Sequence, residues 1–169
     1  MERRRHRNPP SLSCRYPLLS ITLLVSACGG LPTTPEQPSL VLAYALSLQG
    51  VPYRSGGNSP QMGFDCSGFV HHVYGRHGIN LPRSSRDMAA LLPSVSVEER
   101  RPGDLLFFNT DGYAFSHVGI YLGQNQFIHA PSHRSGRVMI SPLRHHYWLD
   151  HFVGIRRPGD SPRGRCFFC

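Results

Sequence analysis

The sequence predicts an α+β fold in which N-terminal helices pack on a five- to six-stranded antiparallel sheet. Apolar residues recur at helical spacing in the first half of the chain, and the second half holds short apolar runs separated by Gly, Asn, Asp and Pro. Helices followed by a series of short strands are typical of this class. The 169 residues suffice for one domain of ordinary size once a leader is set aside.

Residues 1–27 predict an export signal, because five arginines precede an apolar run over residues 18–25 and two small residues. The run Val25-Ser26-Ala27-Cys28 resembles a bacterial lipobox, in which the signal is cut before the cysteine and its thiol is lipidated. This resemblance implies a lipid anchor at Cys28 in the cell envelope, and Gly29 is compatible with the outer membrane, facing the periplasm. The alternative is an ordinary secreted protein in which Cys28 is unmodified.

The domain itself is expected over residues 38–157. Residues 28–37 are rich in Gly, Pro and Thr and predict a short tether. Residues 158–169 are rich in Pro, Gly and Arg and predict a disordered tail. Its two cysteines, Cys166 and Cys169, have no second pair to complete a zinc site, so we expect them to oxidise to each other in the periplasm.

Charge gives little support for nucleic-acid binding. Residues 1–27 carry five arginines and one glutamate, half of the formal net charge of +8. The remaining arginines are scattered and form no basic stripe interleaved with aromatic residues. We therefore expect no nucleic-acid partner, and the modest positive charge suits an anionic envelope polymer. We also expect a monomer.

Three helices are expected before the sheet. The first spans residues 40–48 and ends before Gly50. The second covers residues 66–76, and its apolar residues recur on one face. The third covers residues 85–92, with Ser84 as its N-terminal cap.

Five strands are expected in the second half, because short runs of β-branched and aromatic residues are bounded there by turn residues. They cover residues 104–108, 117–122, 126–130, 138–141 and 152–156. Between the last two strands, Pro142 and Leu143 are expected to begin a short helix or a turn. Trp148 and Tyr147 are expected to close the sheet as a hydrophobic plug.

Cys66 lies at the junction between a polar turn and the second helix, and we interpret it as a nucleophile. At the first turn of a helix, a thiol meets unpaired backbone N–H groups and the positive end of the helix dipole, which favour the thiolate. The alternative is a small buried hydrophobic residue, which is a common role for a lone cysteine.

Two histidines supply the base that such a thiol needs. His117 begins one predicted strand and His129 lies late in the next, with the short turn 123–125 between them. Antiparallel strands joined by a short turn bring these positions to the same edge of the sheet. We therefore predict a triad of Cys66, His117 as base and His129 as the residue that orients it. Structural histidines, or a zinc site that uses the same three residues, are the alternatives.

Several motifs resemble those of the NlpC/P60 family of peptidoglycan hydrolases, which have a papain-like fold. The segment Phe64-Asp65-Cys66-Ser67-Gly68-Phe69-Val70 is similar to the family's nucleophile motif. Residues 116–123 are similar to its base motif, and residues 127–130 to the motif of the third residue. Two further segments, residues 52–57 and 81–85, match recurrent family segments, so that the resemblance extends from about residue 49 to residue 157.

The resemblance implies a cysteine endopeptidase that needs no cofactor and hydrolyses amide bonds in peptidoglycan stem peptides. The bond would be the one between D-glutamate and the diamino acid, or the cross-link between stems, and the reaction would pass through an acyl-enzyme intermediate. The competing functions are a catalytically silent peptidoglycan-binding or adaptor lipoprotein, and a zinc-binding protein.

The resemblance also implies roles for residues around the nucleophile. The hydroxyl of Tyr53 and the backbone N–H of Cys66 would stabilise the oxyanion. Asp65 and Ser67 would bind polar groups of the peptide, and Arg83 would meet a substrate carboxylate. Helix capping explains Asp65 equally well, and packing or a surface salt bridge explains Arg83.

Overall fold

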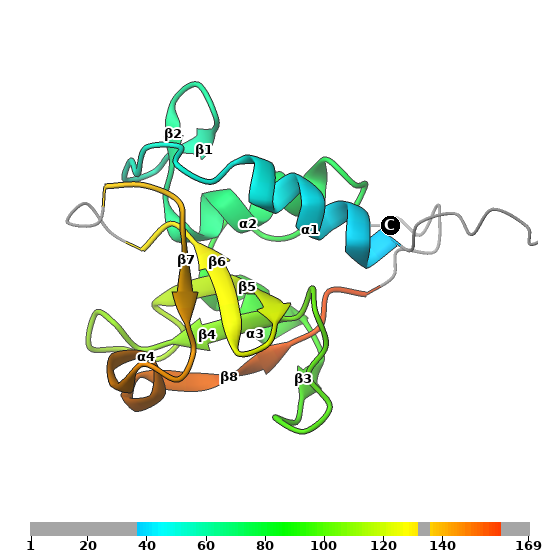
Figure 1. The fold of residues 1–169 in the computed structure, drawn as a ribbon, viewed down its shortest axis with the longest axis vertical. Coiled ribbons are helices and arrows are strands. Elements are labelled where there is room, and N and C mark those ends of the chain that lie inside the picture. Colours follow the sequence, from blue (N-terminus) through cyan, green and yellow to red (C-terminus); the bar gives the residue numbers. More distant parts are fainter. Residues whose placement is uncertain (1–36, 132–135, 160–169) are drawn as a thin grey trace, which may run out of the picture. The chain divides into compact units, whose positions relative to one another are not determined.

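The computed structural model describes residues 37–131 and 136–159 of the chain (Figure 1). The expected leader and tether, the lipidation site at Cys28 and the cysteine pair in the C-terminal tail lie outside the described residues. Within the described ranges, no helix is long and apolar enough to cross a membrane.

The described residues form four α-helices, three of which confirm predicted ones. They are α1 (Gln37–Ser47), α2 (Cys66–Gly75), α3 (Ser85–Leu91) and α4 (His146–Asp150). The Ser84 side chain accepts a hydrogen bond from the Asp87 N–H at 3.1 Å, which caps α3 as expected. Of the two alternatives expected at Pro142 and Leu143, the turn is present: Pro142 ends a strand, Leu143 lies in a turn, and the short helix α4 begins only at His146.

Six antiparallel strands form the main sheet in the order β3-β8-β4-β5-β6-β7, as the fold class requires. They are β3 (Ser94–Val95), β4 (Leu105–Phe108), β5 (His117–Gly123), β6 (Gln126–His129), β7 (Met139–Pro142) and β8 (Phe152–Arg156). The five expected strands are confirmed to within one residue at each end. β3 was not expected, because two residues are too few to show an alternating pattern. A separate hairpin pairs β1 (Asn58–Ser59) with β2 (Gly63–Phe64) just before α2.

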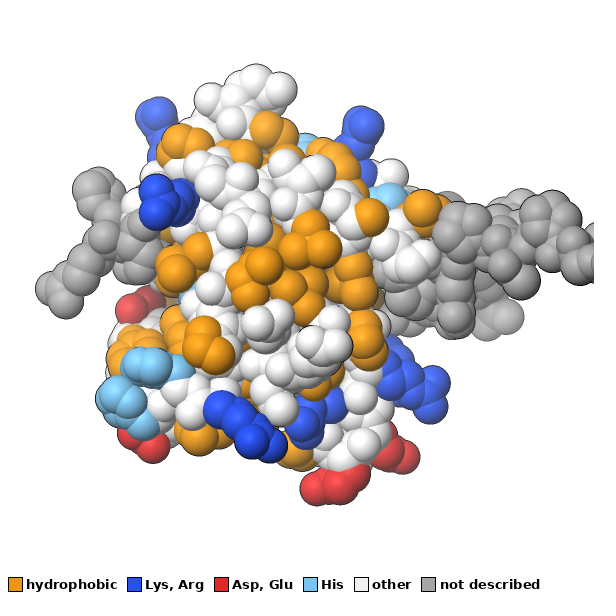
Figure 2. Space-filling view, viewed as in Figure 1, with side chains coloured by type: hydrophobic (Ala, Val, Ile, Leu, Met, Phe, Trp, Pro, Cys, Tyr) orange, Lys and Arg blue, Asp and Glu red, His pale blue; other side chains and the backbone are white. Residues whose placement is uncertain are grey.

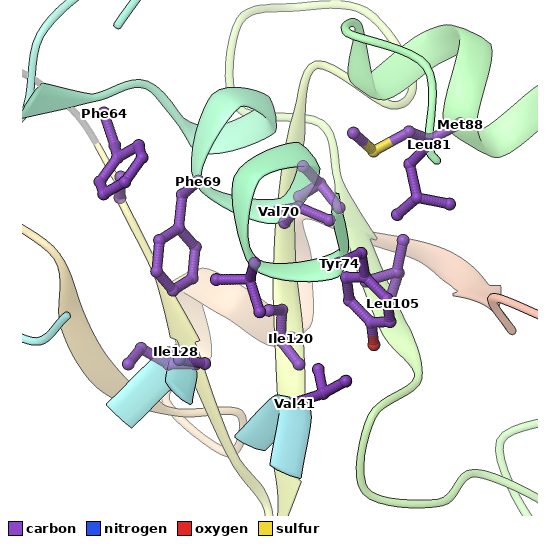
Figure 3. Close-up of a cluster of buried hydrophobic side chains, with 14 of the residues drawn as sticks. Val41, Phe64, Phe69, Val70, Tyr74, Leu81, Met88, Leu105, Ile120 and Ile128 are labelled. Atoms are coloured by element: carbon purple, nitrogen blue, oxygen red, sulfur yellow. The ribbon is translucent and has the colours of Figure 1, made fainter. Parts of the chain in front are cut away.

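The first face of the sheet packs against the helices, with α1 and α2 lying along one side of it (Figure 1). A continuous core of buried side chains fills this layer (Figure 3). The α2 residues Phe69, Val70 and Val73 are fully buried there. They share the core with Phe107 of β4 and Ile120 of β5. This packing holds the start of α2, and therefore Cys66, against the sheet.

The second face carries a smaller cluster. Its buried members are Leu106, Phe108, Tyr121, Phe127, Leu143 and Ile155, with Trp148 and Phe152 packed against them. In β4, Leu105 and Phe107 point to the first face, while Leu106 and Phe108 point to the second. Burial on both faces explains why this strand is apolar throughout rather than alternating.

Candidate active site

The start of α2 is fixed by Asp65. The backbone of Asp65 is extended (φ −89°, ψ 175°), and its Oδ1 accepts a hydrogen bond from the Gly68 N–H at 2.7 Å. This is the geometry of an N-terminal helix cap, so the capping role considered for Asp65 is present. Cys66 follows directly as the first residue of the helix.

The thiol of Cys66 lies against the backbone on both sides of His117. Its Sγ is 4.0 Å from the carbonyl oxygen of Ser116, to which it donates. The backbone N–H groups of Val118 and Ser67 donate to the same sulfur. The helix start therefore meets β5 at the residue that the sequence indicates as the base.

The thiol is nevertheless protonated at neutral pH. The pKa of Cys66 is raised from 9.0 to about 11, first by burial and then by the negative charge of Asp65, with a smaller effect of Asp111. The two backbone N–H groups lower the pKa but do not compensate. The expectation that the helix start favours the thiolate is therefore wrong for this structure, because desolvation outweighs the N–H groups. A base must take the proton when the sulfur reacts.

The structure brings His117 and His129 together. Nε2 of His117 lies 2.7 Å from Nδ1 of His129, and the ring planes are inclined by 75°. Both side chains are buried. The other ring nitrogen of His129, Nε2, lies 2.9 Å from the hydroxyl oxygen of Ser141 on β7. His129 is thus held at both nitrogens, which suits a residue that orients its neighbour.

Both imidazole rings are neutral at neutral pH. Burial lowers the pKa of His117 from 6.5 to about 4. Burial also lowers the pKa of His129 well below 6.5, and the neighbouring His117 lowers it further. A neutral imidazole has one acceptor nitrogen. Because Nε2 of His117 is engaged by His129, Nδ1 is the nitrogen that remains for the thiol.

The Cys66 thiol and the His117 imidazole are not hydrogen-bonded to each other; this holds for the two residues as the structure describes them. Such bonds are often long before a substrate is bound and shorten in the complex.

Trp148 of α4 covers the histidine pair. Its ring stacks on His117 with a centroid distance of 5.6 Å and meets His129 edge-on at 4.8 Å. The expected plug is therefore formed by Trp148, whereas Tyr147 is exposed and stacks on His151 at 4.3 Å. The aromatic cover keeps water from the two rings and explains part of their low pKa values.

Gly119 gives the histidine pair its space on β5. A Cβ at this position would stand 2.7 Å from a ring carbon of Phe127 and 3.1 Å from the Cβ of His129. Any larger residue would push these side chains away from the strand. The glycine therefore allows His129 to lie close to His117.

Asp65, Ser67 and Arg83 form one closed network beside Cys66. Arg83 pairs with Asp65 through two hydrogen bonds, of 2.9 Å to Oδ1 and 2.6 Å to Oδ2. It also donates to Ser67 Oγ at 2.8 Å and to the Gly57 carbonyl at 3.2 Å. The guanidinium is thus already paired within the protein, as in the salt-bridge alternative, rather than open to a substrate carboxylate.

Tyr53 lies near the start of α2. Its backbone forms a bridge with Phe64, two residues before Cys66. The pKa of Tyr53 is raised first by burial and then by the negative charges of Cys66, Asp65 and Asp111, which shows that these groups lie near its hydroxyl. The hydroxyl remains protonated at neutral pH, so it is available as a donor.

Three residues of the site were not found by sequence reasoning as members of it: Asp111, Ser141 and Trp148. Asp111 precedes β5 in a loop whose N–H groups, at Thr110 and Asp111, donate to Ser116 Oγ at 2.8 and 3.2 Å. Ser141 is identified only by strand register, since it pairs with Phe127 across β6 and β7.

A metal site made by Cys66, His117 and His129 is not formed. Across residues 37–131 and 136–159, no three His, Cys, Asp or Glu side chains lie close enough together to hold a metal ion. The two histidines use the facing nitrogens for each other and for Ser141 instead.

Fold and site together define a class: α+β domains with a cysteine at a helix start, placed beside a buried histidine pair on an antiparallel sheet. More closely, the chain belongs to the NlpC/P60 family, whose sequence profile matches residues 50–157.

Two curated relatives show the range of named activities in this family. The chain is 43% identical over 113 residues to the murein DD-endopeptidase MepH of Escherichia coli (strain K12), a match that covers 64% of this chain and 41% of MepH. It is 40% identical over 119 residues to the bifunctional muramidase/DL-endopeptidase CwlT of Bacillus subtilis (strain 168), covering 69% of this chain and 35% of CwlT. The chain thus matches less than half the length of either relative.

Solved structures share the fold. A lipoprotein-like NLP/P60 protein from Staphylococcus aureus superposes with a TM-score of 0.67 at 38% identity, over 74% of this chain and 42% of that one. RipD of Mycobacterium tuberculosis, described as a non-catalytic NlpC/p60 domain protein adapted to peptidoglycan binding, gives a TM-score of 0.59 at 28% identity, over 73% of this chain and 98% of RipD.

Proposed function

We propose that the protein is a cysteine endopeptidase that hydrolyses amide bonds in peptidoglycan stem peptides. The observation that carries this proposal is the contact of the Cys66 thiol with the backbone on either side of His117, whose ring is hydrogen-bonded to His129. Membership of the NlpC/P60 family, with relatives named as endopeptidases, supports the substrate class.

The proton moves during the attack, because both thiol and imidazole are neutral at rest. Sγ of Cys66 bonds to the carbonyl carbon while its proton passes to Nδ1 of His117. When the C–N bond breaks, His117 gives that proton to the leaving amine, and a thioester remains. Water then attacks the thioester, loses a proton to His117, and releases the acid as the proton returns to the sulfur.

The oxyanion would be held by the backbone N–H of Cys66 and the hydroxyl of Tyr53. The raised pKa of Tyr53 supports this role, since the hydroxyl keeps its proton at the pH of the reaction. Asp65 and Ser67 would form one wall of the peptide site, and Arg83 would hold both in place through the hydrogen bonds described above.

We place this activity in the cell envelope. The lipobox at Val25-Ser26-Ala27-Cys28 supports a lipid anchor at Cys28, with the domain facing the periplasm. There the chain would act as a monomer on the wall, without a nucleic-acid partner.

A second candidate is a wall-binding protein without catalysis. Two observations favour it: the raised pKa of the Cys66 thiol, and the absence of a hydrogen bond between this thiol and the ring of His117, both of which are described residues. The likeness to RipD shows that the fold can serve this role in a relative.

The test uses the full chain in detergent under reducing conditions, incubated with purified peptidoglycan sacculi. Mass spectrometry of the released muropeptides should show new peptide ends, and these ends identify the bond that is cut. Cys66→Ala should release none, while Leu91→Ala, an exposed control on α3, should match the unmodified chain. Equal release by Cys66→Ala would contradict the proposal.

Two further outcomes separate the alternatives. Tight binding of the unmodified chain to sacculi without any cleavage would establish the wall-binding function. Loss of cleavage with a chelator, but not with a thiol alkylator, would indicate a metal mechanism instead.

A further inference from the structure

The histidine pair continues into a third side chain, Ser141. This residue is 5% exposed, and its Oγ lies 2.9 Å from Nε2 of His129. Ser141 pairs with Phe127 across β6 and β7, so it lies on the second face of the sheet together with His117 and His129. β7 is an edge strand, and this serine is its buried polar residue.

The direction of the hydrogen bonds decides whether His117 is a base. If Nε2–H of His129 donates to Ser141, then Nδ1 of His129 accepts from Nε2–H of His117, and Nδ1 of His117 is left unprotonated. If instead Ser141 donates to His129, the proton of His129 sits on Nδ1 and points at His117. Nδ1 of His117 then carries a proton and has no lone pair for the thiol.

We propose that Ser141 is a positioning residue whose hydroxyl accepts from Nε2–H of His129 and so keeps His117 in the tautomer that can take a proton from Cys66. This inference rests on the function proposed above. Ser141 acts on His117 through two hydrogen bonds in series, of 2.9 and 2.7 Å.

The surroundings leave this role to Ser141. The second face around the pair is aromatic, with Phe127 at 4.5 Å and Trp148 at 4.8 Å from the His129 ring centre. The structure shows no carboxylate on His129 among the residues it describes, so a hydroxyl stands where a carboxylate would otherwise fix the tautomer.

The direct test is the nitrogen-15 spectrum of the full chain labelled at histidine, recorded in detergent near neutral pH. We expect both His117 and His129 to carry the proton on Nε2, because the shifts of protonated and unprotonated ring nitrogens are far apart. A proton on Nδ1 of either ring would overturn the proposal. This measurement needs neither a variant nor peptidoglycan.

The second test compares kinetics of three variants. Ser141→Ala should lower kcat about 10-fold to 100-fold with little change in KM, since only the tautomer is affected. Ser141→Thr, which keeps the hydroxyl, should recover most of the rate. Ser94→Ala, at the opposite edge strand, removes a serine bonded to Arg156 and should leave kcat unchanged. A full rate in Ser141→Ala, or a folded Ser141→Thr as slow as Ser141→Ala, would overturn the inference.

These outcomes are separable from failure of the proposed function. If sacculi are not cleaved, the rate at which a small neutral alkylating agent modifies Cys66 still reports whether His117 accepts its proton. Ser141→Ala should then slow this alkylation by a similar factor, and an unchanged rate would count against Ser141 alone.

Discussion

The two faces of the central sheet are built for different tasks. The face toward the helices is packed almost entirely with apolar side chains, and Cys66 lies at its rim. The opposite face buries three polar residues, His117, His129 and Ser141, beneath the ring of Trp148. The difference teaches that one face supplies most of the apolar packing and the other holds the groups proposed to transfer the proton. β5 connects them because the thiol rests on the backbone that carries His117.

The largest effect is expected from the second face. His117→Ala should lower kcat for muropeptide release by about 10²-fold to 10⁴-fold, because the proton acceptor is lost. The rate should be measured together with urea unfolding. The matched control is His146→Ala, which changes an exposed histidine of α4 and should keep full activity. Figure 2 shows histidines gathered at the lower left, over this part of the fold. A folded His117→Ala with normal kcat would remove the distinction between the faces.

On the first face, a substitution should lower stability far more than activity. Phe69→Ala removes a fully buried ring of α2 and should lower the free energy of unfolding by about 3–5 kcal/mol. The kcat per folded molecule should change far less than in His117→Ala. Leu91→Ala, at a position that is 70% exposed, should stay within about 0.5 kcal/mol of the unmodified chain. If Phe69→Ala and Leu91→Ala both lost several kcal/mol of unfolding free energy, burial would not explain the difference expected between these two positions.

The dependence of stability on pH should also differ between the faces. The pKa of His117 falls from 6.5 to about 4 on folding, so its contribution is present above pH 6.5 and is lost as the pH falls through about 4. It amounts to about 3 kcal/mol. The pKa of Cys66 rises from 9.0 to about 11, so its contribution is present below pH 9 and is lost as the pH rises toward 11.

Urea unfolding between pH 4 and pH 7 measures the acid limb of this dependence. His117→Ala should reduce the slope of this limb and leave the part that comes from His129, whose pKa is also lowered. Cys66→Ala should leave the acid limb unchanged and flatten only the alkaline limb, which is measured between pH 9 and pH 11. An acid limb of equal slope in the chain with and without His117 would contradict the assignment.

The smallest effect is expected at Asp111, which lies near the Cys66 thiol. Asp111→Asn removes a negative charge that raises the pKa of Cys66, so this pKa should fall by less than about one unit. The rate of Cys66 alkylation as a function of pH should shift to lower pH by that amount. Glu98→Gln, an exposed change on the loop after β3, should leave the profile in place. A shift to higher pH would have the wrong sign for a carboxylate near the thiol.

The main elements and the positions of Cys66, His117 and His129 could be predicted because their signals are local. The helical stripe after Cys66 and the short turn between two strands suffice to place the thiol at a helix start and the two histidines at one sheet edge. The N-terminal cap at Asp65 is also local, because its hydrogen bond reaches only three residues along the chain, to Gly68. Local spacing therefore decides which residues meet.

What the sequence did not reveal depends on distant contacts. The pKa of the Cys66 thiol follows from burial, which the residue pattern around Cys66 does not indicate. The helix dipole alone therefore predicted a pKa shift in the wrong direction. Arg83 turned out to bind Asp65, 18 residues away, through an arrangement of loops that spacing does not determine. Ser141 needed the register of β6 with β7, and Trp148 needed a five-residue helix without an ordinary cap.

Gly119 limits how the sequence can vary beside the rings of His117 and His129. Since a Cβ there would stand 2.7 Å from Phe127 and 3.1 Å from His129, the size of the residue at position 119, rather than its chemical character, decides which substitutions fit. A chain that acquires alanine at 119 must relieve the contact with residue 127, and the Cβ of His129 and the carbonyl oxygen of Ile128, each 3.1 Å away, must also shift slightly. Positions 119 and 127 are therefore expected to change together among homologues, a coupled substitution that an alignment of the family would detect.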